Sequence, residues 1–548
     1  MRLLFIIAII ISFTACSEKN LEIVPRDRLS DATVWNDAKT ANLFLNDIYN
    51  NLNAGPFVTT FTNQPSEISN DPLDNFTDNT CYGPVAGITS AKLFDPGSYS
   101  PAESLFHPMW GNMYDRIRKC NLFLEKVAGA PFDEADKKVM IAQARFLRAY
   151  FYKMLIDLYG GVPLITKVLN NNVDGDDIFY PRNSYEECIA FLQTECDAAY
   201  ADLPLTWTGK DIGRATKGAA LALKGEAELY AGKWEQAAAT NKKIMDEMGN
   251  GIVYDLFPDY AGLFYANNEN NEEVIFDIQF APNIKTKRIN QYWGVVELPK
   301  GGGWGAACPT HDLVEEYEFI DGKTAAEGSA YYDPAKPYEN REKRFYASII
   351  YDGSIWRGAP VYTRLGIPNN NNEIRQGGNG GRTGYFIKKL QDSTIGSTAA
   401  QAALDGTNVI VWRYAEVLLN YAEAQNEAVG PDQSVYDAVN AVRARAGQPD
   451  LPPGLSKEAM REKIRHERRI EFAFEGKRFY DIRRWKIAEQ IFSQPIHGME
   501  IKEENGQLVY NKIVIRNVHF DPSKHYLQPI PQVAIDRNSK LVQNPNYN

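Results

Sequence analysis

The stretch GRATKGAALALKGEAELYAGKWEQAA, residues 213–238, decides the fold of this chain. Apolar and small residues recur at helical spacing up to residue 230, and Gly218, Ala222 and Gly225 form one stripe that lets another helix backbone come close. A short turn containing glycine follows, and Trp234 opens a second periodic segment. Two such helices with small residues at their crossing are typical of a tetratricopeptide-like pair, although the full repeat motif is not matched. The stretch therefore predicts a helical scaffold.

Helical spacing continues on both sides of this pair. The segment at 134–158 ends at Gly160, Gly161 and Pro163, which together form a strong helix stop. The aromatic residues inside the helical segments are expected to fill the core: Phe146, Tyr150, Phe151, Tyr159, Trp234, Phe472, Phe474 and Trp485. The other predicted helices are residues 37–52, 109–127, 185–202, 409–428, 434–446 and 456–475.

Two long segments lack this periodicity. Residues 55–106 are rich in Pro, Asn, Asp, Gly and Thr, and they form a far longer connection than usual, although their aromatic content argues against disorder. Residues 251–408 are also irregular, with strand-like runs such as EEVIFDIQF and RFYASIIY between Gly and Asn clusters. The predicted architecture is mainly α, with a loop-rich side and a few short strands.

The N-terminus has the layout of an export signal. A charged residue, an apolar run and small residues precede Cys16, and the run is too short to span a bilayer. A small residue directly before a cysteine fits the lipobox of bacterial lipoproteins, although Phe13 stands where leucine is usual. We therefore predict a signal peptide at 1–15, lipidation of Cys16 and a tether at 16–36. The alternatives are a plain secretory peptide or a short anchor helix.

Composition excludes some classes of protein. The 548 residues carry a formal net charge of -11, which disfavours broad attraction to nucleic acid. Six cysteines occur, and the five that follow Cys16 have no CxxC spacing. Buried free thiols are expected, and the sequence leaves room for one disulfide pair.

Motifs for catalysis, metals and cofactors are missing. His466-Glu467 starts like the zincin motif HExxH, but Ile470 stands where the second histidine would be. The charged run at 461–485 is interpreted as a helix whose charges pair with each other and with neighbouring helices, rather than as a catalytic or polyanion-binding site. No catalytic residue, metal ligand or cofactor is predicted.

Six stretches together resemble the RagB/SusD family of Bacteroidetes outer-membrane lipoproteins. They are RFLRAYFYKMLIDLYGGVPLI, the opening stretch, THDLVEEYEFIDGK, RYAEVLLNYAEAQNEA, IRHERRIEFAFEGKRFYDIRRWK and YLQPIPQVAIDRNSKLVQNPNY. The resemblance implies four tetratricopeptide-like helix pairs opposite a loop-rich side, with an N-terminal region at 37–250 and a C-terminal region at 251–548. It also implies a non-catalytic surface lipoprotein that binds a nutrient, usually an oligosaccharide, and delivers it to a SusC-like TonB-dependent transporter.

Proteins bind sugars by packing aromatic rings against the C–H faces and by hydrogen-bonding the hydroxyls with amide, carboxylate and guanidinium groups. Such residues usually lie on loops. Trp304, flanked by glycines in GGGWG, is the first candidate, and the alternative is that it folds back as a loop plug. The candidates in the first loop region are Asp71, Asp74, Asn75, Tyr82 and Tyr99. Those in the second are Asn290, Tyr292, Trp293 and Trp304, and Trp356 in DGSIWRG is a further one.

Other functions are weighed against glycan uptake. Tetratricopeptide-like pairs often bind peptides, so the chain could be a peptide-binding uptake protein or an interaction scaffold. An apolar groove would favour peptide, whereas loops dense in aromatic residues and amides favour sugar. A surface hydrolase would need a pair of carboxylates, and nothing in the sequence singles one out.

Overall fold

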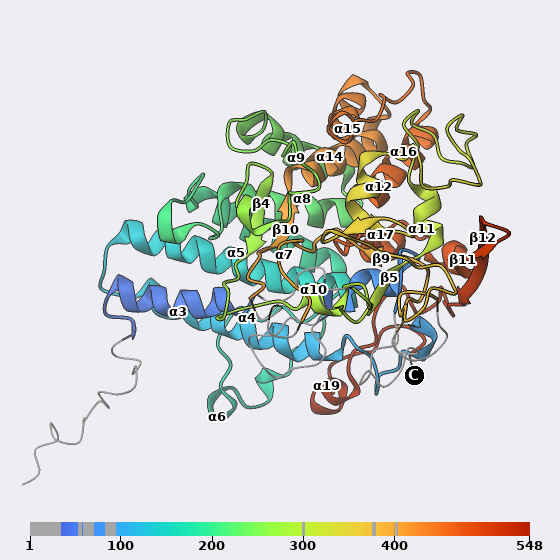
Figure 1. Ribbon diagram of the computed structural model, residues 1–548. Helices are drawn as coiled ribbons and strands as arrows, with labels where there is room; N and C mark the ends of the chain where they lie inside the picture. The colour runs from blue at the N-terminus through green and yellow to red at the C-terminus, as the bar shows by residue number, and fades with distance from the viewer. Residues whose placement is uncertain are drawn as a thin grey trace, which may run out of the picture.

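The computed structural model describes residues 34–52, 57–58, 71–82, 95–298, 302–374, 380–398, 401 and 404–547. Long helices dominate it, and neighbours along the chain pack on one another from α4 through α5, α7, α8 and α9 to α14. Figure 1 shows these helices as a stacked array, with the β11–β12 hairpin at the far edge. Their bounds are α3 (Ala38–Asn50), α4 (His107–Ala128), α5 (Glu134–Tyr159), α7 (Tyr185–Asp202), α8 (Lys217–Tyr230), α9 (Trp234–Met248), α14 (Tyr414–Val429), α15 (Gln433–Ala446), α16 (Lys457–Glu471) and α17 (Lys477–Arg484).

The mainly α prediction is confirmed, and the packing of successive helices is consistent with tetratricopeptide-like pairs. The remaining helices are short: α6 (Asn171–Asp174), α10 (Ile289–Tyr292), α11 (His311–Glu316), α12 (Lys343–Ser348), α18 (Ala488–Phe492) and α19 (Gln532–Arg537). No helix within the described ranges is long and apolar enough to cross a membrane. The signal peptide and Cys16 lie outside the described residues. Val34 and Trp35, at the end of the expected tether, are buried in the core.

Strands occur as antiparallel two-stranded pairs. The pair β3 (Thr80–Tyr82) and β5 (Ala307–Pro309) joins the N-terminal segment to the middle of the chain. The other pairs are β1 (Phe57–Val58) with β2 (Asp71–Pro72), β4 (Val274–Ile278) with β10 (Val409–Arg413), β6 (Ile349–Ile350) with β9 (Phe386–Ile387), β7 (Ile355–Trp356) with β8 (Ala359–Pro360), and β11 (Ile496–Glu504) with β12 (Gln507–Arg516).

Three sequence predictions differ from the structure. Residues 409–413 form strand β10 rather than the start of a helix, because VIVWR is rich in β-branched and aromatic residues and pairs with β4. The predicted helix at 456–475 ends at Glu471, and Phe474 beyond it has a left-handed φ of 68°. The strand-like run RFYASIIY is helical up to Ser348 and extended only after it.

The glycine stripe of α8 has the role that the sequence indicates. A Cβ added at Gly218 would lie 2.3 Å from the Tyr254 hydroxyl, and one at Gly225 would lie 2.7 Å from Nδ2 of Asn241 on α9. The missing side chains therefore allow α8 to sit close to its neighbours. Contacts this short leave no room for a methyl group without displacing the partner.

We expect Gly218→Ala to lower the free energy of unfolding by about 1–3 kcal/mol, because the new methyl group overpacks the contact with Tyr254. The matched control is Gly111→Ala in α4, where an added Cβ meets nothing within 4 Å. That change should stabilise the protein by up to about 1 kcal/mol, since alanine favours the helix over glycine. Urea denaturation of both variants measures the difference, and a destabilised Gly111→Ala with an unaffected Gly218→Ala would contradict the packing argument.

Much of the charged run of α16 and α17 is buried, as Glu467, Arg468 and Glu471 are. The Glu471 side chain is fully buried, its partners' side chains are at most 4 % exposed, and it contacts Arg344 at 3.0 Å and Arg413 at 2.6 Å and is also paired with Arg445. The network continues through further pairs: Arg344 with Glu342 and Glu467, Arg413 with Glu273 and Glu475, and Arg443 with Glu318 and Glu467. The predicted pairing with neighbouring helices is confirmed, since Arg443 and Arg445 of α15 pair with Glu467 and Glu471 of α16. Further partners of these two carboxylates, such as Arg344 of α12, also come from other elements rather than from one turn away.

Candidate functional site

The structure buries the acidic and amide candidates of the first loop region. Asp74 and Asn75 are fully buried. The Asp74 carboxylate accepts hydrogen bonds from the backbone N–H groups of Phe474 at 3.4 Å and Gly476 at 3.1 Å. Burial raises the pKa of Asp74 to about 6, and these hydrogen bonds oppose that rise. Asp74 therefore fastens the N-terminal segment to the turn between α16 and α17, a structural role that differs from the ligand contact expected from the sequence.

The aromatic candidates of that region are buried as well. Tyr82 is 5 % exposed and Tyr99 is 4 % exposed, and both belong to the main hydrophobic core. Asp71 starts β2, and its side chain lies outside the described residues. In its described part, the predicted binding loop packs against the start of α17, through Asp74, Phe76 and Asp78.

Three candidates of the second region are also interior. Trp293 is fully buried in the main core, and Trp356 belongs to a small apolar cluster with Phe386. Asn290 is buried too, where it donates to Asp405 at 2.9 Å and accepts from Arg357 at 2.8 Å. Side chains this deeply buried stabilise the fold and present no accessible surface in this structure, which differs from the ligand contacts expected of them from the sequence.

Tyr292 and Trp304 remain as partly exposed candidates that the structure brings together. Their ring centroids lie 4.6 Å apart with an interplanar angle of 60°. The Trp304 N–H donates to the carbonyl of Gln291 at 2.8 Å, which fastens the tryptophan segment to α10. The two rings thus have a fixed arrangement on the loop-rich side of the protein, and we call this pair the aromatic corner.

The glycines around Trp304 stand where two backbone segments come very close. A Cβ at Gly302 would lie 1.8 Å from the carbonyl oxygen of Val296, and one at Gly303 would lie 2.6 Å from that of Gln291. The glycines therefore let two backbone segments touch, which holds Trp304 against Tyr292. An aromatic corner of this kind can pack against the C–H face of a sugar ring.

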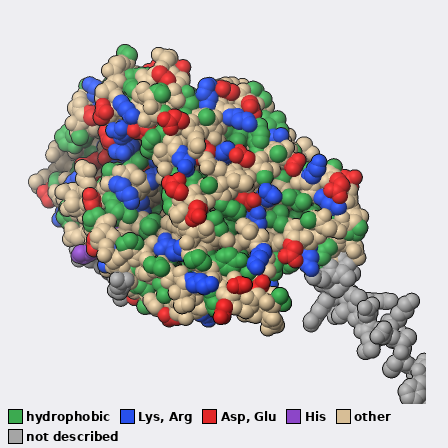
Figure 2. All heavy atoms as spheres, turned by 180° about the vertical axis from the view of Figure 1, so that it is seen from behind, with side chains coloured by type: hydrophobic (Ala, Val, Ile, Leu, Met, Phe, Trp, Pro, Cys, Tyr) green, Lys and Arg blue, Asp and Glu red, His purple; other side chains and the backbone are tan. Residues whose placement is uncertain are grey.

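A large charged groove was not predicted. Its volume is 1030 Å³, and its walls come from α11, α16 and the β11–β12 hairpin. Figure 2 shows a hollow with Lys, Arg, Asp and Glu side chains along its walls. Charges pair across the walls, as between Lys512 and Glu315 at 2.6 Å, and the His497 ring forms a hydrogen bond with Asp312 at 2.8 Å. Its residues come from separate elements, so only the acidic run in THDLVEEYEF hinted at it.

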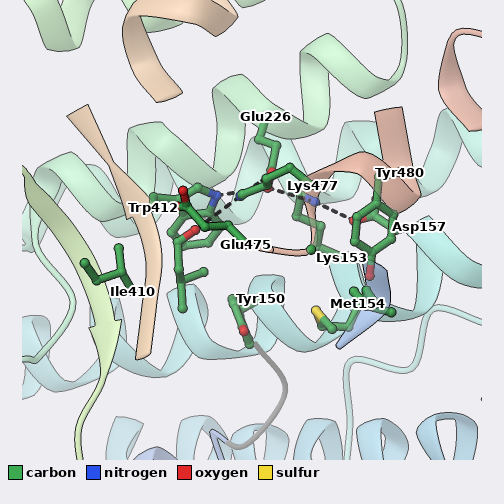
Figure 3. A pocket seen from close by; sticks show the side chains of 13 residues that line it. Tyr150, Lys153, Met154, Asp157, Glu226, Ile410, Trp412, Glu475, Lys477 and Tyr480 are labelled. Atoms are coloured by element: carbon green, nitrogen blue, oxygen red, sulfur yellow. Dashed lines mark hydrogen bonds and ion pairs between the residues drawn. The ribbon is translucent and has the colours of Figure 1, made fainter. Parts of the chain in front are cut away.

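A second polar cavity lies inside the helical core. Lys153 and Lys477 both pair with Glu226, at 2.9 and 3.0 Å, and Lys153 also meets Asp157 at 2.5 Å (Figure 3). Burial raises the pKa of Asp157 to about 6, against the opposing effect of Lys153. The cavity volume of 50 Å³ has room for a water molecule or two but not for a sugar ring. This cluster therefore joins α5, α8 and α17 and does not bind a nutrient.

The five cysteines in the described ranges, Cys81, Cys120, Cys188, Cys196 and Cys308, are free and buried. Burial raises the pKa of the Cys308 thiol to about 12. Since the thiolate is the reactive form, such thiols are inert. This agrees with the expectation of buried free thiols.

Comparison with known proteins matches this architecture. The SusD family profile matches residues 265–547, and a second profile, described as starch-binding associating with outer membrane, matches residues 57–226. The chain belongs to the SusD family. SusD-like protein P2 of Formosa agariphila is 28% identical over 461 residues, which cover 80% of each chain.

Two solved structures from Bacteroides fragilis share the fold. One is a SusD-like protein with a TM-score of 0.81 and 30% identity, and the match covers 96% of this chain and 100% of that one. The other is a SusD-like carbohydrate binding protein with a TM-score of 0.81 and 29% identity, covering 93% of this chain and 100% of the other. The resemblance read from the sequence is confirmed.

Proposed function

We propose that this SusD-family chain is a surface-exposed, lipid-anchored outer-membrane protein that binds an oligosaccharide and delivers it to a SusC-like TonB-dependent transporter. The single observation that carries the glycan proposal is the partly exposed Tyr292–Trp304 pair, fixed on the loop-rich side. A SusD-like carbohydrate binding protein of the same fold supports it. The protein acts by binding alone, without catalysis.

Lipid anchoring rests on Cys16 and the apolar run before it. An acylated N-terminal cysteine would hold the protein at the membrane and leave the folded part free to meet both ligand and transporter. Mass spectrometry of the N-terminal peptide from the native organism's membranes tests this directly. Co-purification of the transporter with the tagged full-length chain tests the partner.

Replacing Trp304 with alanine should weaken glycan binding by tenfold or more, because half of the aromatic corner is lost. Calorimetric titration of the full-length chain with plant, host and microbial oligosaccharides measures it. Tyr331→Ala, at a tyrosine that is 45% exposed in another loop, is the aromatic control and should bind like the wild type.

Binding that survives in a folded Trp304→Ala variant would remove the aromatic corner from the site while keeping the glycan function. A chain that binds peptides and no glycan would favour the alternative, a peptide-binding uptake protein.

A further inference from the structure

A small pocket whose walls contain neither Tyr292 nor Trp304 lies where the end of α3, the loop between α7 and α8 and the end of β4 meet. Its volume is 300 Å³, at the lower end of the range of about 300–1,000 Å³ for ligand pockets. None of the ligand residues predicted from the sequence lines it.

Lys285 supplies a buried cation to this pocket. The side chain is 8% exposed, and its ammonium group donates to the carbonyls of Leu52 at 2.9 Å and Asn50 at 3.4 Å, at the end of α3. Within the described ranges no carboxylate pairs with it. Burial lowers the pKa of Lys285 to about 8, and the charge of Arg116 lowers it further.

Asp277 supplies a buried anion to the same pocket. It is 2% exposed, and its carboxylate accepts hydrogen bonds from Gln279 at 2.5 Å and Asn408 at 2.9 Å. In the part of the chain that the structure describes, no cation pairs with it. Burial raises the pKa of Asp277 to about 6, and the two amides oppose the rise.

This arrangement differs from the large charged groove, where Glu315 pairs with Lys512 and Glu316 pairs with Arg469. In the pocket, a cation and an anion are buried in the same walls without an ion pair to each other. Burying an unpaired charge is unfavourable, and perturbed ionisable groups in a cleft are typical of functional sites. A ligand that forms hydrogen bonds with both groups would reduce the free-energy cost of burying their charges.

The rim of the pocket adds a guanidinium and amides. Arg214 donates to the side-chain carbonyl of Asn46 at 2.6 Å. A second pocket of 190 Å³ adjoins this one through Arg214 and Asp277, and the half-buried ring of Trp207 lines it. Amides, charged groups and one aromatic face are the set that recognises sugars.

We propose that this pocket binds one sugar residue, with one hydroxyl accepting from Lys285 and a neighbouring hydroxyl donating to Asp277. A hydroxyl group both donates and accepts, so adjacent hydroxyls satisfy a cation and an anion in the same walls. A ligand carboxylate would instead be repelled by Asp277. The proposal rests on the proposed glycan function and adds a second point of contact to it.

The test is to soak crystals of the full chain in D-glucose, D-galactose and D-mannose in turn, and to titrate the same sugars in solution. We expect sugar density between Lys285 and Asp277. Lys285→Met and Asp277→Asn should each weaken that binding by about tenfold or more, since each removes a charged hydrogen bond. Lys323→Met, at an exposed lysine elsewhere, is the matched control and should leave binding unchanged.

Thermal melting shows whether each variant still folds, and binding at the Tyr292–Trp304 corner shows whether the rest of the protein is intact. Sugar density at the aromatic corner alone would overturn the pocket and leave the proposed function standing. Density at neither place, with no binding in solution, would overturn both. Wild-type affinity in the folded Lys285→Met and Asp277→Asn variants would overturn the assigned contacts.

Discussion

Glu471→Gln is expected to lower the free energy of unfolding by about 3–5 kcal/mol, because it removes one partner from a buried ionic network. The Glu471 carboxylate meets Arg344, Arg413 and Arg445 with no exposed surface of its own. When this carboxylate is replaced by a neutral amide, the three guanidinium groups stay buried with less negative charge to balance them. Urea denaturation followed by circular dichroism measures the loss.

The control for this prediction is Glu462→Gln in the same helix. Glu462 is 69% exposed and pairs with Arg465 at 2.9 Å, so its loss should cost only about 0–1 kcal/mol. Equal losses for the two variants would show that burial does not set the strength of these pairs.

The same substitution has a predictable dependence on pH. Burial favours the neutral form of Glu471, but Arg445, Arg413 and Arg344 outweigh it and hold the pKa well below the usual 4.5. A group whose pKa is lowered by folding stabilises the native state above its unfolded pKa and loses that effect as the pH falls. The difference between wild type and Glu471→Gln should therefore be full at neutral pH and shrink as the pH falls below about 4.5.

Local sequence signals explain which elements could be predicted. The helix at 185–202 was predicted with the bounds that α7 has, and Ser184 caps its N-terminus in a capping box. The β11–β12 hairpin was missed, although Asn505-Gly506 carries the hairpin signal and both residues have positive φ, 52° and 77°. The apolar and β-branched residues of QLVYNKIVIR also favour a strand, so both signals for this hairpin were present in the sequence.

The site was harder to predict than the fold because burial is not a local property. Asp74 and Trp304 both stand in segments of loop composition, yet one is fully buried and the other lies at the surface. What buries Asp74 is the turn at Gly476, some four hundred residues away. The pocket that contains Lys285 and Asp277 could not be predicted for the same reason, since α3 and β4 are distant in sequence and meet only in the folded chain.

Trp293→Ala tests whether Trp293 belongs to the core or to the binding surface. Trp293 and Trp304 stand eleven residues apart, but Trp293 is fully buried and Trp304 is partly exposed. Trp293 is among the largest fully buried side chains, so its truncation should lower the free energy of unfolding by about 3–5 kcal/mol. Urea denaturation measures this loss.

Trp304→Ala is the matched comparison, since the same chemical change is made at a partly exposed ring. It should cost about 1 kcal/mol or less in stability and act on glycan binding instead. Conversely, Trp293→Ala should keep its glycan affinity under conditions where it remains folded, because its ring has no surface for a ligand to touch. A stable Trp293→Ala variant that has lost glycan binding would contradict the core assignment and return this tryptophan to the binding site.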